Sequence, residues 1–348
     1  MTSTPQERSK SHHHVPKFML RGFADPDGRL TVVKVRPTPI VERGKHPRRV
    51  GVVERLNSWE HPDGSFDDEL ERVPLGRLDS FGAEGLRDLV GFAKSVRPEG
   101  QLRLLDRDWE DRIALTMHTA GLMVRSPKLR EALDEQALPT MIEHMRAKLL
   151  RAVEAGEAEE QHVRPVLLAF DRPGMVWLEP GRNRHQAALV DLITTATAAI
   201  GATHIVSVRR VQAPLLTGSE PVILFRDPDI VGGVSCAELL SEADPPVAFW
   251  EQRPDMLARV NEILAATAGL AWAADRHTVV LMSNPETADG ARLTYLFNEL
   301  PGDALAGILN LKVTAASDWV AGAAGGELLE ILARNVESAA KGSRKAPQ

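Results

Sequence analysis

Three consecutive histidines stand near the start of the chain, in residues 11–25, which read SHHHVPKFMLRGFAD. Histidine titrates near neutral pH, so His12, His13 or His14 could act as a general acid, a general base or a metal ligand. Consecutive side chains of an extended segment point to opposite faces, so the three histidines cannot all bind one metal ion. The alternative interpretation is a histidine that only makes a structural hydrogen bond.

Two arginines could bind an anion. Arg21 lies at the end of the histidine stretch, and Arg125 lies where a proline two residues further on interrupts a helical pattern. A guanidinium group binds phosphate or carboxylate through two parallel hydrogen bonds, so the pair could clamp a phosphate-bearing substrate. The alternative is that these arginines bridge helices to internal acids such as Asp79 or Glu69.

Ser219 and Glu220 lie in a glycine-containing loop before a predicted strand, which is a common place for functional residues. Glu220 could orient a catalytic histidine or hold a metal ion, and Ser219 could contact a substrate. Ser219 lacks the G-x-S-x-G turn of a hydrolase nucleophile, so a turn or capping role is its alternative.

Several well-known motifs are missing from the sequence. It contains no G-x-x-x-x-G-K or G-x-G-x-x-G phosphate loop, no H-E-x-x-H pair and no C-x-x-C pair. Nucleotide-loop enzymes and zinc enzymes are therefore disfavoured. The sequence assigns no metal ligands and identifies no cofactor.

Charge is unevenly distributed along the chain. The net charge is −6, yet residues 1–60 hold 12 Lys and Arg against 6 Asp and Glu. Such a basic region could meet phosphate or nucleic acid, although scattered surface arginines are common. The single cysteine, Cys236, cannot form an internal disulfide, which favours a cytoplasmic location. The longest mostly apolar segment, residues 187–202, is too short and too polar to span a membrane, so we expect no membrane partner.

The segments that must position these groups predict an α+β fold that is predominantly helical with a small antiparallel sheet. A Pro-Asp-Gly turn at residues 26–28 separates the histidine stretch from the first β-branched run. Strands are predicted at residues 29–35, 50–56, 203–211, 221–225 and 278–282, with 203–211 and 221–225 paired. Helices are predicted at residues 74–95, 109–124, 139–155, 186–200, 254–274, 288–299, 303–311 and 325–338.

The same pattern suggests four parts. Residues 1–10 form a disordered tail, and residues 11–200 hold the histidine stretch, the small sheet and a helical region. Residues 201–340 form a second α+β region packed on the first, because a chain of 348 residues is long for one core. Residues 341–348 form a loose tail.

The order of these motifs resembles the domain of unknown function 4238 family. That family opens with a motif close to H-Y-V-P and then a pattern near Q-F-Y-L-R-N-F, which residues 13–23, HHVPKFMLRGF, match in register. The resemblance places His13, Arg21 and the R-x-P at Arg125 on family positions. A family loop like T-S-D-N-P-V corresponds to TGSEPV at residues 217–222, with Ser219 and Glu220 in place of Asp and Asn. The likeness extends over residues 11–285 and implies a mostly helical α+β fold without an established activity.

Two functions follow as hypotheses. In the first, a hydrolase acts on a phosphate-bearing substrate such as nucleic acid, with His13 and Glu220 as catalytic residues and Arg21, Arg125 and Ser219 as substrate-binding residues. In the second, the protein is a non-enzymatic binding or interaction module whose motif residues are structural. The first requires His13, Arg21, Arg125 and Glu220 to meet at one cleft within about 10 Å.

Overall fold

The computed structural model describes residues 11–61, 64–97, 102–104, 109–170, 181–243 and 253–343. The predicted tails at residues 1–10 and 341–348 lie outside these ranges, except that the last helix reaches Ser343. The α+β prediction is confirmed, but the single small sheet is wrong, since the described residues form four antiparallel sheets. None of the described helices combines the length and the apolar character needed to cross a bilayer.

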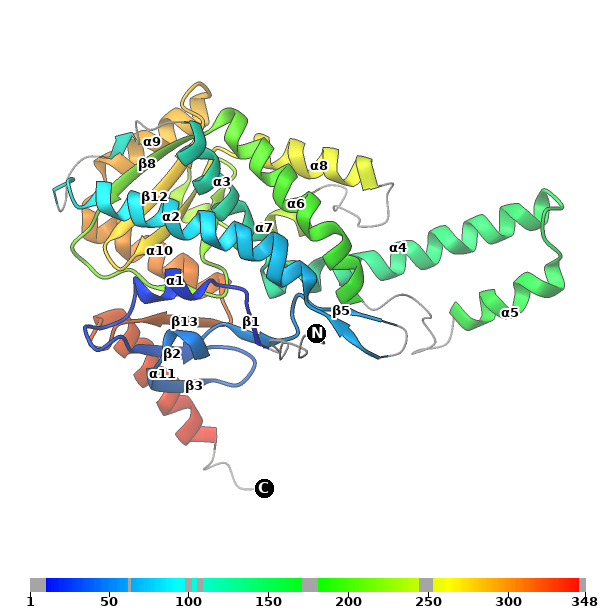
Figure 1. The fold of residues 1–348 in the computed structure, drawn as a ribbon, viewed down its shortest axis with the longest axis horizontal. Helices are drawn as coiled ribbons and strands as arrows, with labels where there is room; N and C mark the ends of the chain where they lie inside the picture. The colour runs from blue at the N-terminus through cyan, green and yellow to red at the C-terminus, as the bar shows by residue number, and fades with distance from the viewer. Residues whose placement is uncertain are drawn as a thin grey trace, which may run out of the picture.

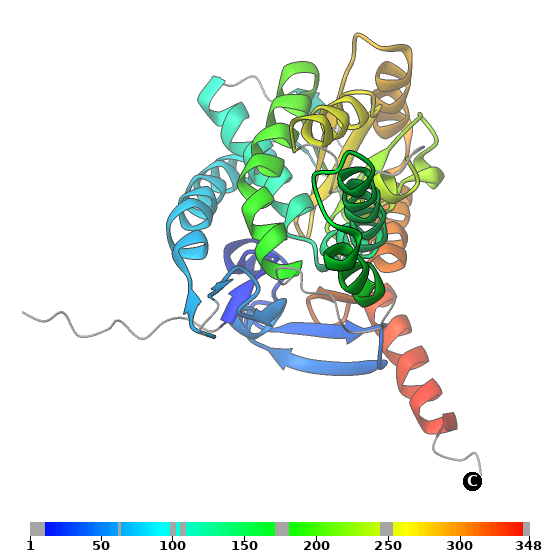
Figure 2. The ribbon, with the colours of Figure 1, turned by 90° about the vertical axis from the view of Figure 1, so that its right-hand side faces the viewer.

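The larger sheet has five strands in the order β10-β11-β12-β8-β7. Its strands are β7 (Arg103–Leu104), β8 (Ile205–Arg210), β10 (Val222–Phe225), β11 (Gly269–Asp275) and β12 (Thr278–Ser283). Every residue of β10 and β12 is buried, because helices cover both faces of this sheet. The helices α2 and α3 lie against one face, and α9 and α10 lie against the other (Figures 1 and 2).

The second sheet has four strands in the order β3-β2-β13-β9. Its strands are β2 (Leu30–Lys34), β3 (Ile40–Lys45), β9 (Thr217–Gly218) and β13 (Trp319–Gly322). The last helix, α11, packs on β2 and β3 (Figure 1). Two short pairs complete the strands, β1 (Ser11–His13) with β4 (Val52–Glu54) and β5 (Trp59–Glu60) with β6 (Phe66–Asp67).

The helices connect and cover these sheets. Their bounds are α1 Lys17–Arg21, α2 Gly76–Ala93, α3 Trp109–Val124, α4 Pro127–Glu154, α5 Glu160–Phe170, α6 Gly181–Thr203, α7 Cys236–Ser241, α8 Arg253–Ala265, α9 Ala288–Glu299, α10 Gly302–Ala316 and α11 Glu327–Ser343. Short helical turns lie at η1 (Pro47–Arg49), η2 (Glu71–Leu75) and η3 (Ile230–Gly232). The pair α4 and α5 extends away from the two sheets (Figure 1).

Two local predictions are wrong for a common reason. The run at residues 254–274 was expected to be one helix, but α8 ends at Ala265 and β11 begins at Gly269. The runs 203–211 and 221–225 are strands, yet β11 and β12 lie between them in the sheet. Both errors arise because a strand buried on two faces lacks an alternating pattern and takes its partners from distant sequence.

The predicted division of the chain at residue 200 stays a prediction. Strands from both sides of it share sheets, since β7 pairs with β8 and β13 pairs with β2. One continuous cluster of buried apolar side chains includes Phe23 and Leu122 from the first region and Phe225 and Leu293 from the second.

Candidate functional site

His12 and His13 belong to β1 and His14 follows it directly, and the three imidazoles have different surroundings. His12 is buried, and its Nδ1 accepts the backbone N–H of Asn57 at 2.9 Å. His13 is half-buried and donates from Nδ1 to the Val50 carbonyl at 3.1 Å. Burial is the main cause that lowers the pKa of His13. The predicted catalytic histidine is thus tied to the backbone of the neighbouring segment.

His14 is the histidine without a hydrogen-bond partner. Its ring is buried, and within the described residues neither ring nitrogen has a donor or acceptor nearby. Burial, together with the nearby His13, Arg130 and Arg125, lowers the pKa of His14 to about 3. The imidazole is therefore neutral at physiological pH, with one nitrogen able to donate and the other able to accept.

Arg125 lies at the break between α3 and α4. It is 1% exposed, and its Nη2 donates to the Asp79 carboxylate of α2 at 2.7 Å. This ion pair is the internal pairing expected under the alternative interpretation of the arginines. The Nε and Nη1 of Arg125 have no described partner. A buried guanidinium with two unused nitrogens retains hydrogen-bonding capacity, but its only described anion is an internal one.

The next residue links this break to the loop before β10. Ser126 is the N-cap of α4, since its hydroxyl accepts the Leu129 N–H at 3.1 Å, and Pro127 follows at the first helical position. The same hydroxyl donates to a carboxyl oxygen of Glu220. Two of the predicted motifs are thus in direct contact through Ser126.

The loop itself is held by backbone and hydroxyl groups next to β13. The Ser219 hydroxyl accepts the Asp318 N–H at 2.8 Å, and the Glu220 N–H donates to the Ser317 hydroxyl at 3.0 Å. Gly218 is required by close packing, since a Cβ there would lie 2.9 Å from the Trp319 carbonyl oxygen. Ser219 is buried, and its hydroxyl joins this loop to the segment before β13.

Glu220 is 2% exposed. Burial raises its pKa to about 8, against the opposing effects of the Ser126 hydroxyl and the Lys128 ammonium. At neutral pH the side chain is therefore mostly a protonated acid. A neutral carboxyl group can donate a hydrogen bond, but it is not an anionic metal ligand or a carboxylate partner for histidine.

A pocket of about 250 Å³ lies where the three motifs meet. His14, Pro127 and Ser219 line it, so each motif contributes one residue to its wall. We call this space the motif pocket. The rest of the lining includes Lys34, Glu42, Arg49, Asp318 and Trp319. His13, Arg21, Arg125 and Glu220 are not part of its lining, so the four residues required for the first hypothesis do not meet at this surface.

The charges around the motif pocket favour an anion. Lys34 pairs with Glu42 at 3.6 Å, and Asp318 is neutralised by Arg36 at 3.3 Å and by Lys128 at 3.7 Å. Arg49 is exposed and has no carboxylate within ion-pair distance in the described part of the chain. Arg49 is therefore a lining cation that no described carboxylate pairs with.

Arg21 belongs to a separate basic surface beside the pocket. Burial is the largest cause that lowers the pKa of His46, and the next causes are the charges of four cations, Arg48, Arg29, Lys17 and Arg21. These four cations therefore lie around His46. All four are exposed, and none forms an ion pair with a described carboxylate. We call Lys17, Arg21, Arg29 and Arg48 the basic patch. Because Arg48 and Arg49 are neighbours in η1, the patch adjoins the motif pocket.

The motif match in register favours His13, whereas His14 is the histidine that lines this pocket. The burial alternates along this stretch, since His12 in β1 and His14 just after it are buried whereas His13 is half-buried. No sequence signal pointed to Arg49 or Asp318. Within the described ranges, no group of three His, Cys, Asp or Glu side chains is arranged to hold a metal ion.

Comparison with protein families matches residues 11–236 to a protein of unknown function, DUF4238. The chain belongs to this family. The matched range covers all three motifs of the pocket, so the DUF4238 region contains His14, Pro127 and Ser219. Searches among curated proteins and among solved structures found no match.

Proposed function

We propose that this DUF4238 protein binds a phosphate-bearing ligand in the motif pocket. The observation that carries the proposal is that three motifs, more than 200 residues apart at the extremes, each contribute one residue to the same pocket. Arg49 supplies a guanidinium that has no partner carboxylate among the described residues, and His14 contributes a neutral, buried imidazole to the wall. In this arrangement Arg125 and Glu220 do not contact the ligand. Both adjoin Ser126, and they position the segment that places Pro127 in the pocket lining.

Nucleic acid is the ligand class that the surroundings favour. The basic patch continues from the pocket along η1 and α1, and it offers Arg21, Arg29 and Arg48 to further phosphates of a polymer. An acid also lies there, since Asp25 accepts the backbone N–H of Arg29 at 2.7 Å. The four exposed cations carry more positive charge than that turn carries negative charge. The binding of a nucleic-acid strand across the patch is therefore electrostatically favourable.

Binding can be tested with two probes, inorganic phosphate and a fluorescent single-stranded oligonucleotide. Arg49→Gln should weaken the binding of both probes by about tenfold, since a hydrogen bond to a charged group contributes about 1.5 to 3 kcal/mol. Arg21→Gln should weaken only the binding of the oligonucleotide, and it should make that binding less dependent on salt concentration. Arg87→Gln, an exposed arginine on α2, is the matched control. Equal effects of Arg49→Gln and Arg87→Gln, or no binding of phosphate, would refute the proposal.

Hydrolysis is a second candidate, and the observation that favours it is that neither ring nitrogen of His14 has a hydrogen-bond partner among the described residues. A ring nitrogen would accept a proton from water, the water oxygen would bond to phosphorus, and the bond from phosphorus to the leaving oxygen would break as that oxygen takes a proton. A pKa of about 3 makes His14 a weak base in the free protein. A bound phosphate favours the protonated ring and raises that pKa toward neutrality.

A phosphodiester such as bis(p-nitrophenyl) phosphate tests this candidate. His14→Gln should abolish release of nitrophenol and keep phosphate binding, and His13→Gln is the matched control. Loss of turnover in His13→Gln alone would assign the catalytic role to His13, as the sequence predicted. If the wild-type protein binds phosphate and shows no turnover, the binding function stands and hydrolysis is refuted.

A further inference from the structure

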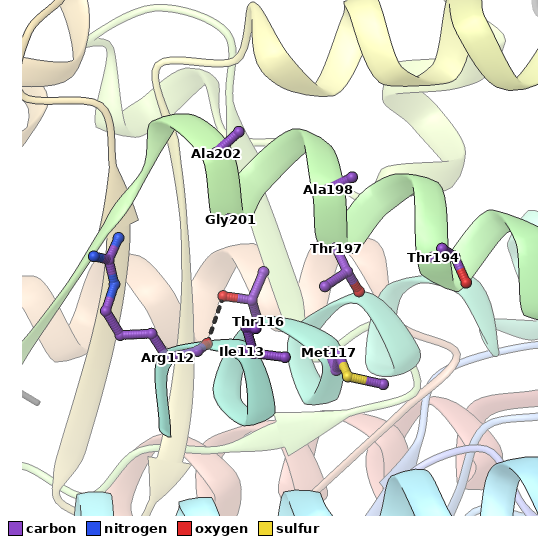
Figure 3. A pocket seen from close by; sticks show the side chains of 9 residues that line it. All are labelled: Arg112, Ile113, Thr116, Met117, Thr194, Thr197, Ala198, Gly201 and Ala202. Atoms are coloured by element: carbon purple, nitrogen blue, oxygen red, sulfur yellow. Dashed lines mark hydrogen bonds between the residues drawn. The ribbon is translucent and has the colours of Figure 1, made fainter. Parts of the chain in front are cut away.

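A second pocket lies between α3 and α6, away from the three motifs (Figure 3). Its volume is about 440 Å³, within the range of about 300 to 1,000 Å³ that is typical of small-molecule sites. Ile113 and Met117 of α3 and Thr197 and Ala198 of α6 are among the residues that line it. We call this pocket the α3–α6 groove.

The walls of the groove are apolar because their hydroxyl hydrogens are used within the helices. Thr116 donates to the Arg112 carbonyl at 2.8 Å, Thr194 to the carbonyl one turn before it at 2.8 Å, and Thr197 likewise at 2.7 Å. The Thr116 methyl carbon lies 3.7 Å from where a Cβ on Gly201 would stand, so glycine keeps this part of the groove open. A ligand here meets methyl groups and no free hydroxyl donor.

One end of the groove is charged. Arg112 lies at the end opposite Met117 and Thr194, as Figure 3 shows. Its Nη2 donates to the His204 carbonyl at 3.3 Å, and no ion pair with a described carboxylate occupies the guanidinium. The remaining N–H groups can bind a carboxylate in the two-bond geometry that arginine favours.

We propose that the α3–α6 groove binds a small organic carboxylate with an aliphatic body, such as a medium-chain fatty acid. The carboxylate pairs with Arg112, and the chain lies between Ile113, Met117 and Ala198. The Arg112 charge at one end of the groove favours a carboxylate over a neutral lipid. The lack of free hydroxyl donors along the rest of the groove favours an aliphatic chain over a sugar. The site is independent of the motif pocket, since the two pockets share no lining residue.

Octanoate and its neutral analogue octanamide are suitable probes, with isothermal titration calorimetry as the measurement on the full chain. Octanoate should bind at least tenfold more tightly than octanamide, because only the carboxylate pairs with Arg112. Arg112→Gln should remove that difference. Ala198→Phe places a ring in the open groove and should abolish binding of both probes. Since Ala198 is exposed on α6, this variant should keep the helical circular dichroism of the wild type.

Arg87→Gln is again the control and should bind octanoate as the wild type does. Equal affinity for octanoate and octanamide would overturn the role of Arg112, and octanoate binding that survives Ala198→Phe would overturn the location. Self-association of the wild-type chain that Ala198→Phe abolishes would show that a second copy covers the groove, and it would also overturn the proposal.

Discussion

Replacing Glu220 with glutamine changes how the stability of this protein depends on pH. In the unfolded chain the carboxyl group ionises near its ordinary value of 4.5, whereas in the folded protein burial raises its pKa to about 8. Between these values the folded state holds one proton more than the unfolded state. The free energy of unfolding therefore falls as the pH rises through this window. Glutamine cannot ionise, yet its side-chain oxygen still accepts the Ser126 hydroxyl.

The size of the effect follows from a single proton. One proton changes the free energy of unfolding by about 1.4 kcal/mol per pH unit. Between pH 6 and pH 8 the wild-type protein should lose about 2 kcal/mol that the variant keeps, allowing for partial ionisation of the folded state near pH 8. The side chain is almost fully buried, so solvent screening does not reduce this figure substantially.

Urea unfolding at pH 6, 7 and 8 measures this difference. Buried histidines such as His14 titrate alike in both proteins, so they cancel when the two curves are subtracted. Glu54→Gln, at an exposed position on β4, is the control for the loss of any carboxylate. If the stability difference between Glu220→Gln and wild type changes by less than about 0.5 kcal/mol from pH 6 to pH 8, Glu220 is ionised in the folded protein and the reasoning is refuted.

Two further substitutions separate structural from functional roles. Asp79→Ala leaves the buried guanidinium of Arg125 without its anion, which should cost about 3 kcal/mol in urea unfolding. Adding Arg125→Met should recover part of that loss, and no recovery would contradict the assignment of the cost to an unpaired charge. His13→Ala removes one hydrogen bond to the Val50 carbonyl and should cost about 1 kcal/mol in thermal melting. Phosphate binding should survive in this variant, and its loss without a change in melting would instead place His13 in the site.

Local backbone chemistry could be predicted well from the sequence. The break at residues 126–127 followed from proline, and the structure ends α3 at Val124 and caps α4 with Ser126. The turn at residues 26–28 followed from its glycine, and Gly28 has φ of 71°. Each of these features depends on residues next to one another.

Features that depend on distant packing could not be predicted. The alanine-rich run at residues 269–275 resembles a helix, but as β11 it is an interior strand of a sheet that helices cover on both faces. Ile113 and Met117 are apolar residues of α3, yet they are only partly buried and line the open α3–α6 groove. Their exposure depends on the small residues of α6, which the α3 sequence does not contain.

The candidate site also has features that could be predicted from the sequence and features that could not. The first hypothesis required residues of the three motifs to meet, and the Ser126–Glu220 hydrogen bond and the motif pocket bring the motifs together through other side chains. Which side chain of each motif faces the pocket was not predictable, because it depends on strand register and helix rotation. His13 is the last residue of β1 and His14 follows it directly, so one position along the chain separates the predicted histidine from the one that lines the pocket.

The position of β13 has a consequence for how the chain acquires its shape. This strand lies between β2 and β9, and it precedes only α11 in the described sequence. During synthesis, β2 cannot pair with β13 until β13 leaves the ribosome, almost 290 residues later. Until then its inner edge is an open template for pairing with other chains. Folding of the motif pocket is therefore a late event, and a nascent chain stopped before Trp319 exposes both β2 and β9 to aggregation.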